Sequence, residues 1–149
     1  MGDVKRSFSF EIAGLAKGKG RPRFRSTGRF VQTYTDKETA TWENFVRLSY
    51  INSGGEKLSG NIEVVIQSYF PIPKSVSKKK RAQLVGAPFP HKPDCDNLAK
   101  SILDALNGIA FDDDMQVIML VVTKFYAEDA KTVVHLGELE DDYHGKVEA

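Results

Sequence analysis

Acidic side chains gather at two places in the second half of the chain, and grouped carboxylates are typical ligands of metal ions. Asp94 and Asp96 flank Cys95 just before a helical pattern, and in an extended segment residues i and i+2 point to the same side. Residues 112–114 are three consecutive aspartates that precede an apolar run. Mg²⁺ is commonly held by two or three carboxylates together with water and substrate phosphate. The two groups therefore indicate a divalent-cation site; the alternatives are an aspartate that only caps a helix and a solvated acidic turn.

Lys100 is the basic residue best placed to act beside these acids. It follows Asp96 by four residues and precedes Asp104 by four, so a helix would place all three on one face. An exposed ladder of such ion pairs contributes about 0.2–0.5 kcal/mol per pair. Alternatively, Lys100 stabilises the charge that develops on a reacting phosphate. The spacing alone does not separate these two roles.

Basic residues are concentrated in two segments of the first half. Residues 17–25 combine five basic residues with two glycines and a proline, which predicts a loop whose backbone can approach a phosphate. Phe24 or Phe89 would be available to stack on bases. The run 78–81 is entirely basic, and a solvated helix face is its alternative explanation. The candidate phosphate contacts are Lys17, Lys19, Arg21, Arg23, Arg25, Lys78, Lys79, Lys80 and Arg81.

Length and composition indicate one domain with a buried core. The chain has 149 residues, of which 41% are hydrophobic and 28% charged. Its net charge of +1 conceals a division, because residues 1–90 carry 16 Lys and Arg against 7 Asp and Glu, whereas residues 91–149 carry 5 against 13. This division fits a polyanion-binding surface beside a metal site, or two halves whose charges cancel in the fold.

Several other classes of protein lack support in the sequence. A single cysteine, no signal-peptide pattern and no apolar run of about 18 residues together predict a cytoplasmic protein outside the membrane. The glycine-containing loop lacks the Gly-x4-Gly-Lys-Ser/Thr pattern, so no nucleotide cofactor is expected. The three histidines have no zinc-ligand spacing with Cys95.

The pattern of elements predicts an α+β domain over residues 1–149, with about three helices packed on a mixed sheet. Within the first helix, Trp42, Phe45, Val46 and Ser49 are expected to form the buried stripe, and Thr35 to cap its start. The apolar run in 115–126 predicts a central strand covered on both faces. The expected strands are 7–12, 29–33, 61–70, 115–126 and 132–136, the expected helices are 35–51, 78–85 and 97–107, and the acidic tail 138–149 is expected to be flexible.

The motifs around the two acidic groups resemble those of the RusA-type Holliday-junction resolvases. The resemblance rests on HKPDCDNLAK at 91–100, DALNG at 104–108 and DDMQV at 113–117, supported by KGRPRF at 19–24 and the Trp42-Glu43 helix. It extends to about residue 138. Members of this family are small endodeoxyribonucleases, often encoded by prophages, that act in DNA recombination and repair.

This resemblance implies a homodimer that cuts four-way DNA junctions symmetrically and uses Mg²⁺, with Mn²⁺ as a substitute. It places the catalytic residues at Asp94, Asp96, Asp114 and Lys100, and the metal ligands at the same three aspartates and Asp113. Two alternatives remain at this point: a metal-dependent nuclease that prefers flaps or forks, and a non-catalytic protein that binds branched DNA.

Overall fold

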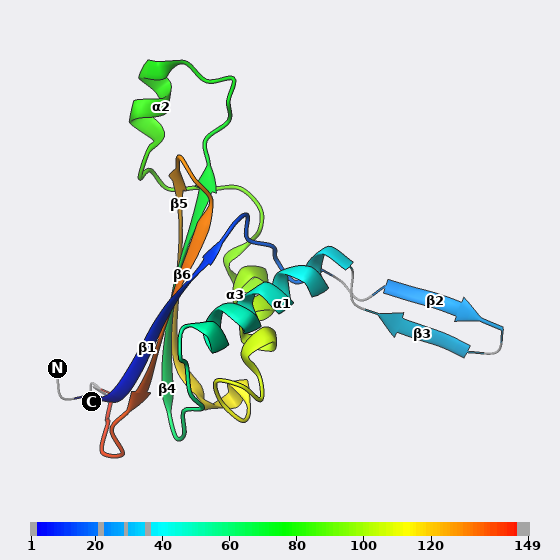
Figure 1. The fold of residues 1–149 in the computed structure, drawn as a ribbon, viewed down its shortest axis with the longest axis vertical. Coiled ribbons are helices and arrows are strands. Elements are labelled where there is room, and N and C mark those ends of the chain that lie inside the picture. Colours follow the sequence, from blue (N-terminus) through cyan, green and yellow to red (C-terminus); the bar gives the residue numbers. More distant parts are fainter. Residues whose placement is uncertain (1–2, 21–22, 29, 35–36, 146–149) are drawn as a thin grey trace, which may run out of the picture.

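The computed structural model describes residues 3–20, 23–28, 30–34 and 37–145 (Figure 1). In these ranges, a four-stranded mixed sheet has the order β1-β6-β4-β5, and helices α1 and α3 cover one of its faces. Strand β6 is antiparallel to both neighbours, whereas β4 and β5 are parallel. The sheet strands are β1 (Val4–Ala13), β4 (Ile62–Pro71), β5 (Val117–Ala127) and β6 (Lys131–Leu139), and the helices are α1 (Lys37–Asn52), α2 (Lys78–Leu84) and α3 (Cys95–Leu106). The predicted α+β class, with three helices and a mixed sheet, is confirmed.

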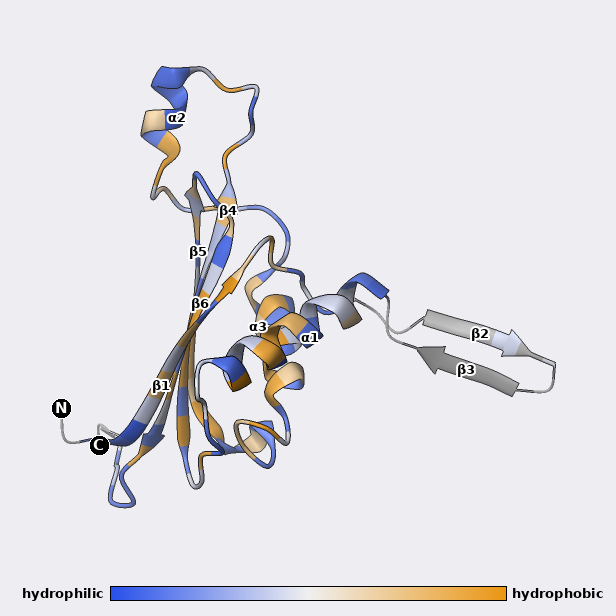
Figure 2. Ribbon diagram, viewed as in Figure 1, coloured by the Kyte–Doolittle hydropathy of each residue, from blue (hydrophilic) through white to orange (hydrophobic). Residues whose placement is uncertain are grey.

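Hydrophobic periodicity explains the core between the sheet and the two helices (Figure 2). In β4 the alternation predicted for Ile62, Val64 and Ile66 places all three side chains in the core. In α3 the predicted stripe is buried at 3.6-residue spacing, with Leu98 and Ile102 fully inaccessible.

The buried stripe of α1 differs from the prediction. Trp42 and Val46 are buried as expected, but Phe45 is 56% exposed, and Tyr50 is fully buried. The buried residues Trp42, Val46 and Tyr50 are four positions apart and lie along one face of the helix. Phe45 lies beside this face and points toward solvent. The predicted cap Thr35 lies outside the described residues.

Strand β5 was expected to be central, and this prediction is wrong. Among the described strands, β5 pairs only with β4 and forms an edge of the sheet. Residues 86–89 cover the far part of its free side, since Phe89 N donates to Lys124 O at 3.0 Å. Along residues 117–122, by contrast, no described backbone pairs with this side. The apolar side chains there are exposed, with Ile118 at 51%, Leu120 at 43% and Val121 at 42%. A continuous apolar run indicates that both faces of a strand are buried, but nothing in the described part of this chain covers residues 117–122 in this way.

The basic segment 17–25 was expected to be a loop throughout, but its last part is a strand. Strand β2 (Arg23–Thr27) pairs with β3 (Phe30–Tyr34) in a hairpin that projects from the body of the molecule (Figure 1). Gly28 has φ +67°, a left-handed conformation typical of a tight hairpin turn. The strand expected at 29–33 therefore pairs locally and does not join the main sheet.

The chain remains ordered at the start of the expected tail. Strand β6 continues to Leu139, and Glu138 is buried within it. The Glu138 carboxylate accepts hydrogen bonds from the backbone N–H of Ser59 at 2.6 Å and from Arg6 at 3.5 Å. These bonds tie β6 to the loop before β4 and to β1. Among the described helices, none is long and apolar enough to cross a membrane.

Glu138 should make the stability of the fold depend on pH. The Ser59 N–H lowers the pKa of Glu138 most, burial opposes this, and the Arg6 charge adds to the lowering. A depressed folded-state pKa stabilises the protein above the unfolded value, about 4.3, and the benefit is lost as pH falls through the folded pKa.

We expect Glu138→Gln to lower the free energy of unfolding by about 1–2 kcal/mol at pH 7, with a smaller difference below about pH 4. Urea unfolding at both pH values measures this. Asp142→Asn changes an exposed carboxylate and should stay within about 0.5 kcal/mol of the parent. Equal stability of both variants at pH 7 would contradict the proposed role of Glu138.

Candidate active site

Asp94 stands at the start of α3 with a carboxylate that does not cap the helix. Its backbone is extended, with φ −63° and ψ 152°, and its carbonyl accepts a hydrogen bond from Leu98 N at 2.9 Å. Asp94 occupies the N-cap position, but its side chain makes no capping hydrogen bond. The carboxylate is thus exposed at the positive end of the helix dipole.

The predicted convergence of Asp94 and Asp96 rested on extended backbone, and this premise is wrong. Helix α3 begins at Cys95, two residues before the expected start, so Asp96 lies in its first turn. Asp94 is extended but Asp96 is helical, so the alternation of an extended segment does not place both side chains on one side. Both carboxylates remain exposed at the same end of α3.

Strand β5 fixes this end of α3. The Lys124 ammonium group donates hydrogen bonds to the carbonyl oxygens of His91 at 2.6 Å and Pro93 at 2.7 Å. The Cys95 thiol lies 4.0 Å from the carbonyl of Val122. The start of α3 therefore lies beside residues 122–124 of β5, immediately beyond the uncovered part of that edge.

The second acidic group lies at the opposite end of α3, in a 3₁₀ turn (Asp114–Gln116). Asp113 caps this turn, because its carboxylate accepts from Met115 N at 3.1 Å. The backbone N–H of Asp114 donates to the Asn107 side-chain oxygen at 3.0 Å, which joins the turn to the C-terminal end of α3. Asp112 instead forms an ion pair with Lys57.

The carboxylates at this end crowd one another. Burial raises the pKa of Asp114, and a hydrogen bond with Asp113 and the charges of Asp113 and Asp104 raise it further. Crowded carboxylate oxygens match the preference of Mg²⁺ for hard oxygen ligands, and a cation there would relieve their repulsion. The donor chemistry of this group and of Asp94 with Asp96 therefore fits a hard divalent cation.

The structure does not bring the two acidic groups together within one chain. Helix α3 has 12 residues and so is about 18 Å long, with Asp94 before its start and Asp114 beyond its end. In the described part of the chain, no group of three or more His, Cys, Asp or Glu side chains is arranged to hold a metal ion. Each group by itself is a partial ligand set.

The ladder considered for Lys100 is not formed among the described residues. Lys100 is exposed and pairs with neither Asp96 nor Asp104. Asp104 pairs instead with Lys19 at 3.3 Å, and Lys19 also contacts Glu43 at 2.6 Å. Burial opposes the charged form of Lys19, but its hydrogen bonds to the two carboxylates outweigh this and raise its pKa.

The Lys19 contacts join the basic segment to both helices. Sequence reasoning gave no role to Glu43 or Asn107, since neither belongs to an acidic group or a charge run. Glu43 pairs with a residue 24 positions away, which only the fold brings near, whereas Asn107 accepts its hydrogen bond from Asp114, seven positions later.

The other candidate phosphate contacts lie on three parts of the molecule. Lys17 is 40% exposed and lies 3.6 Å from Glu38. Arg21 lies outside the described residues, and Arg23 and Arg25 are in β2. Lys78, Lys79 and Lys80 are exposed on α2, beyond the end of the sheet, whereas Arg81 pairs with Glu128 at 3.1 Å (Figure 1).

Two comparisons with known proteins bear on this arrangement. A family model described as "Endodeoxyribonuclease RusA" matches residues 14–137, a range that contains α3 and both acidic groups. A Bacillus subtilis (strain 168) protein named "Uncharacterized protein YqaN" is 33% identical over 135 residues, which cover 87% of this chain and 95% of that protein.

Proposed function

The chain belongs to the RusA endodeoxyribonuclease family, and we propose that it resolves four-way DNA junctions by paired, metal-dependent cuts. The observation that carries this proposal is the pair of carboxylate groups at the two ends of α3, within the matched region. Asp94 and Asp96 are exposed at one end, and Asp114 is crowded by acids at the other.

We further propose that two copies pair through the uncovered edge of β5. An unpaired edge with exposed apolar side chains is a surface that a second strand stabilises. Antiparallel pairing about a two-fold axis at Leu120 would set Leu120 opposite its own copy and Ile118 of one copy opposite Val122 of the other. The apolar residues 118–122 of the two copies would then lie opposite one another. Residues 86–89 would end the pairing near Lys124.

This pairing explains how acids at opposite ends of α3 act together. Asp94 and Asp96 lie beside residues 122–124 of their own β5, and the start of the other copy's β5 would lie opposite. Asp114 directly precedes that start. Each of the two sites would therefore take Asp94 and Asp96 from one copy, and Asp113 and Asp114 from the other.

In each site, the four carboxylates would hold Mg²⁺, for which Mn²⁺ would substitute. The bound ion would supply positive charge for the phosphate and would make water a stronger nucleophile at neutral pH. Lys100 is exposed one helical turn after Asp96, so its ammonium group would donate to a phosphate oxygen and neutralise developing charge. Two symmetry-related sites suit two cuts in opposed strands.

Basic residues on three parts of the molecule would follow the DNA arms. Lys17, the β2 arginines Arg23 and Arg25 with Arg21 before them, and the α2 lysines would contact phosphates, which gives binding with little dependence on base sequence. Lys19 and Arg81 hold carboxylates at 2.6 and 3.1 Å, so we assign them mainly to positioning the basic segment and α2. Lys17 lies farther from its carboxylate, at 3.6 Å, and is more exposed, so it stays available to a phosphate.

The test of this function is the cleavage of a synthetic four-way junction that is end-labelled on each strand. With Mg²⁺ we expect paired, symmetric nicks that are absent with EDTA and absent from a linear duplex. A flapped duplex of the same sequence should be cut more slowly. Tight junction binding without cuts in Mg²⁺ or Mn²⁺ would contradict the proposal, and preferential cutting of the flap would contradict the assigned substrate.

A further inference from the structure

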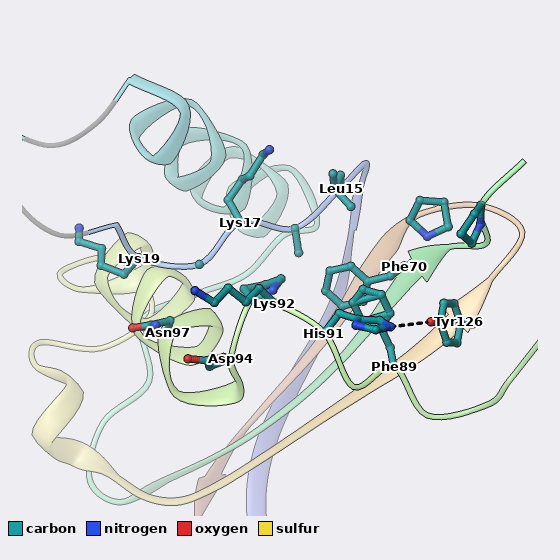
Figure 3. Close-up of a pocket in the computed structure, with 15 residues that line it drawn as sticks. Leu15, Lys17, Lys19, Phe70, Phe89, His91, Lys92, Asp94, Asn97 and Tyr126 are labelled. Carbon is teal, nitrogen blue, oxygen red and sulfur yellow. Dashed lines mark hydrogen bonds between the residues drawn. The ribbon is translucent and has the colours of Figure 1, made fainter. Parts of the chain in front are cut away.

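A cavity of about 680 Å³ opens beside Asp94, between the segment that follows β1 and the segment that precedes α3 (Figure 3). Aromatic rings line one side of it. Phe70 and Phe89 are stacked with ring centroids 4.2 Å apart, and Tyr126 meets the edge of Phe89 at 5.0 Å. The Tyr126 hydroxyl is hydrogen-bonded to His91 Nε2 at 3.1 Å, which fixes both rings.

The rim of the cavity carries polar and basic groups. Lys17, Lys92, Asp94 and Asn97 all line it (Figure 3). Lys92 is exposed and forms no ion pair with the residues that the structure describes. The opening combines an apolar, aromatic interior with cations at its mouth, directly beside a carboxylate assigned to the metal site.

Backbone contacts hold the two walls together. Lys19 N donates to Asn97 O at 2.9 Å, and Gly18 packs so closely on the start of α3 and the segment before it that an added Cβ would lie 3.2 Å from Asn97 Cβ and 2.9 Å from Pro93 Cβ. The cavity is therefore formed before a ligand binds.

We infer that this cavity receives one unstacked base of the strand to be cut, an inference that rests on the proposed function. Its volume lies in the range of ligand sites, about 300–1,000 Å³. Phe70 is buried behind Phe89, so the half-buried Phe89 and Tyr126 and the exposed His91 would contact the base. Lys17 and Lys92 suit the phosphates on either side of it. Because Asp94 belongs to both the rim and the metal site, a base held here would place its own phosphate at the reacting position.

The substrate class follows from the cost of moving a base out of the stack. Unstacking costs less where a base has already lost a stacking neighbour, as in the base pairs that flank the branch point of a junction. A base in this cavity would therefore favour branched DNA over duplex at the cutting step, beyond any preference in binding.

The test combines a cavity-filling variant with a substrate that lacks one base. Leu15 lines the cavity and is 48% exposed, so Leu15→Trp should fill the opening and leave the core intact. Leu48→Trp is the matched control, because Leu48 is 53% exposed on α1, outside the cavity lining. Each protein is given a four-way junction that carries an abasic site, in turn, at each nucleotide beside the cut.

With the parent protein, one abasic position should reduce the cleavage rate about tenfold, the size of effect expected for one stacked base. Leu15→Trp should reduce cleavage of the intact junction by a similar factor, and the abasic site should then cause no further loss. If the rate reductions from Leu15→Trp and from the abasic site multiply, the two act independently and the inference is wrong. The inference is also wrong if no abasic position slows the parent protein, or if Leu48→Trp slows cleavage as much as Leu15→Trp.

Failure of the proposed function gives a different result. In that case the parent protein does not cut the intact junction, and the same comparison is made on junction affinity in EDTA. If the abasic site weakens binding by the parent protein but does not weaken binding by Leu15→Trp any further, a base in the cavity is supported. If the two reductions in affinity multiply, or if neither occurs, the inference is wrong.

Discussion

Asp114→Asn should reduce cleavage of a four-way junction about a thousandfold while junction affinity stays the same or rises. Asn has the shape of Asp but lacks the negative charge that would hold a divalent ion. Asp114 is also crowded by Asp113 and Asp104, so removal of its charge relieves repulsion within the protein and toward phosphate. The cleavage rate should therefore fall while the junction affinity rises or stays the same.

Single-turnover cleavage with Mg²⁺ and junction binding in EDTA measure the two effects separately. Asp112→Asn is the matched control, because Asp112 is the neighbouring aspartate but pairs with Lys57. It should retain cleavage within about threefold, as expected for a surface site away from the chemistry. If Asp114→Asn cuts as fast as the parent, or if both variants lose DNA binding together, the assignment of Asp114 is wrong.

The paired change Leu120→Lys and Val121→Lys should convert the dimer into monomers and abolish paired cleavage. Both side chains are exposed on the edge of β5, one on each face of the sheet, so the lysines should be tolerated by the isolated fold. In the proposed dimer Leu120 would lie opposite its own copy across the two-fold axis, and Val121 would lie opposite Met119 of the other copy and diagonally across from its own copy. Like charges in such contact cost several kcal/mol, which raises the dimer dissociation constant at least about a hundredfold.

Analytical ultracentrifugation and the junction assay test this expectation together. Ile51→Lys is the control, since Ile51 is 50% exposed on α1, away from β5. It should remain dimeric and active. A dimer that persists in the β5 variant would exclude this edge as the interface, and full activity of a monomer would exclude a shared site.

Local patterns in the sequence correctly predicted the strands and helices that have one buried face and one exposed face. Strand β4 and helix α3 obey periods of 2 and 3.6 closely, so their core residues were identified correctly. The prediction for β5 was wrong because hydrophobicity reports that a surface is buried without reporting what buries it. An edge strand that a second copy would cover has the same continuous apolar pattern as a central strand, so the sequence pattern does not distinguish the two.

The candidate site was predictable in its residue types but not in its arrangement. The aspartates were recognised from their clustering and from motif resemblance. The start of α3 at Cys95 depends on how Lys124 holds the preceding carbonyls, which no local rule contains. In the same way, the contacts of Lys19 with Glu43 and Asp104 join segments 24 and 85 positions away in sequence.

The most direct measurement of whether two chains share each site is a mixing experiment with two inactive variants. Asp94→Asn and Asp114→Asn chains carrying different tags are co-expressed, and the heterodimer is isolated through both tags. If each site takes Asp94 from one copy and Asp114 from the other, one site of this heterodimer carries both defects and the other carries none. We therefore predict that the heterodimer regains cutting of one strand per junction, whereas either homodimer is inactive. A heterodimer as inactive as its parents, beside an active tagged wild-type dimer, would show that both aspartates act within one chain and would contradict the shared site.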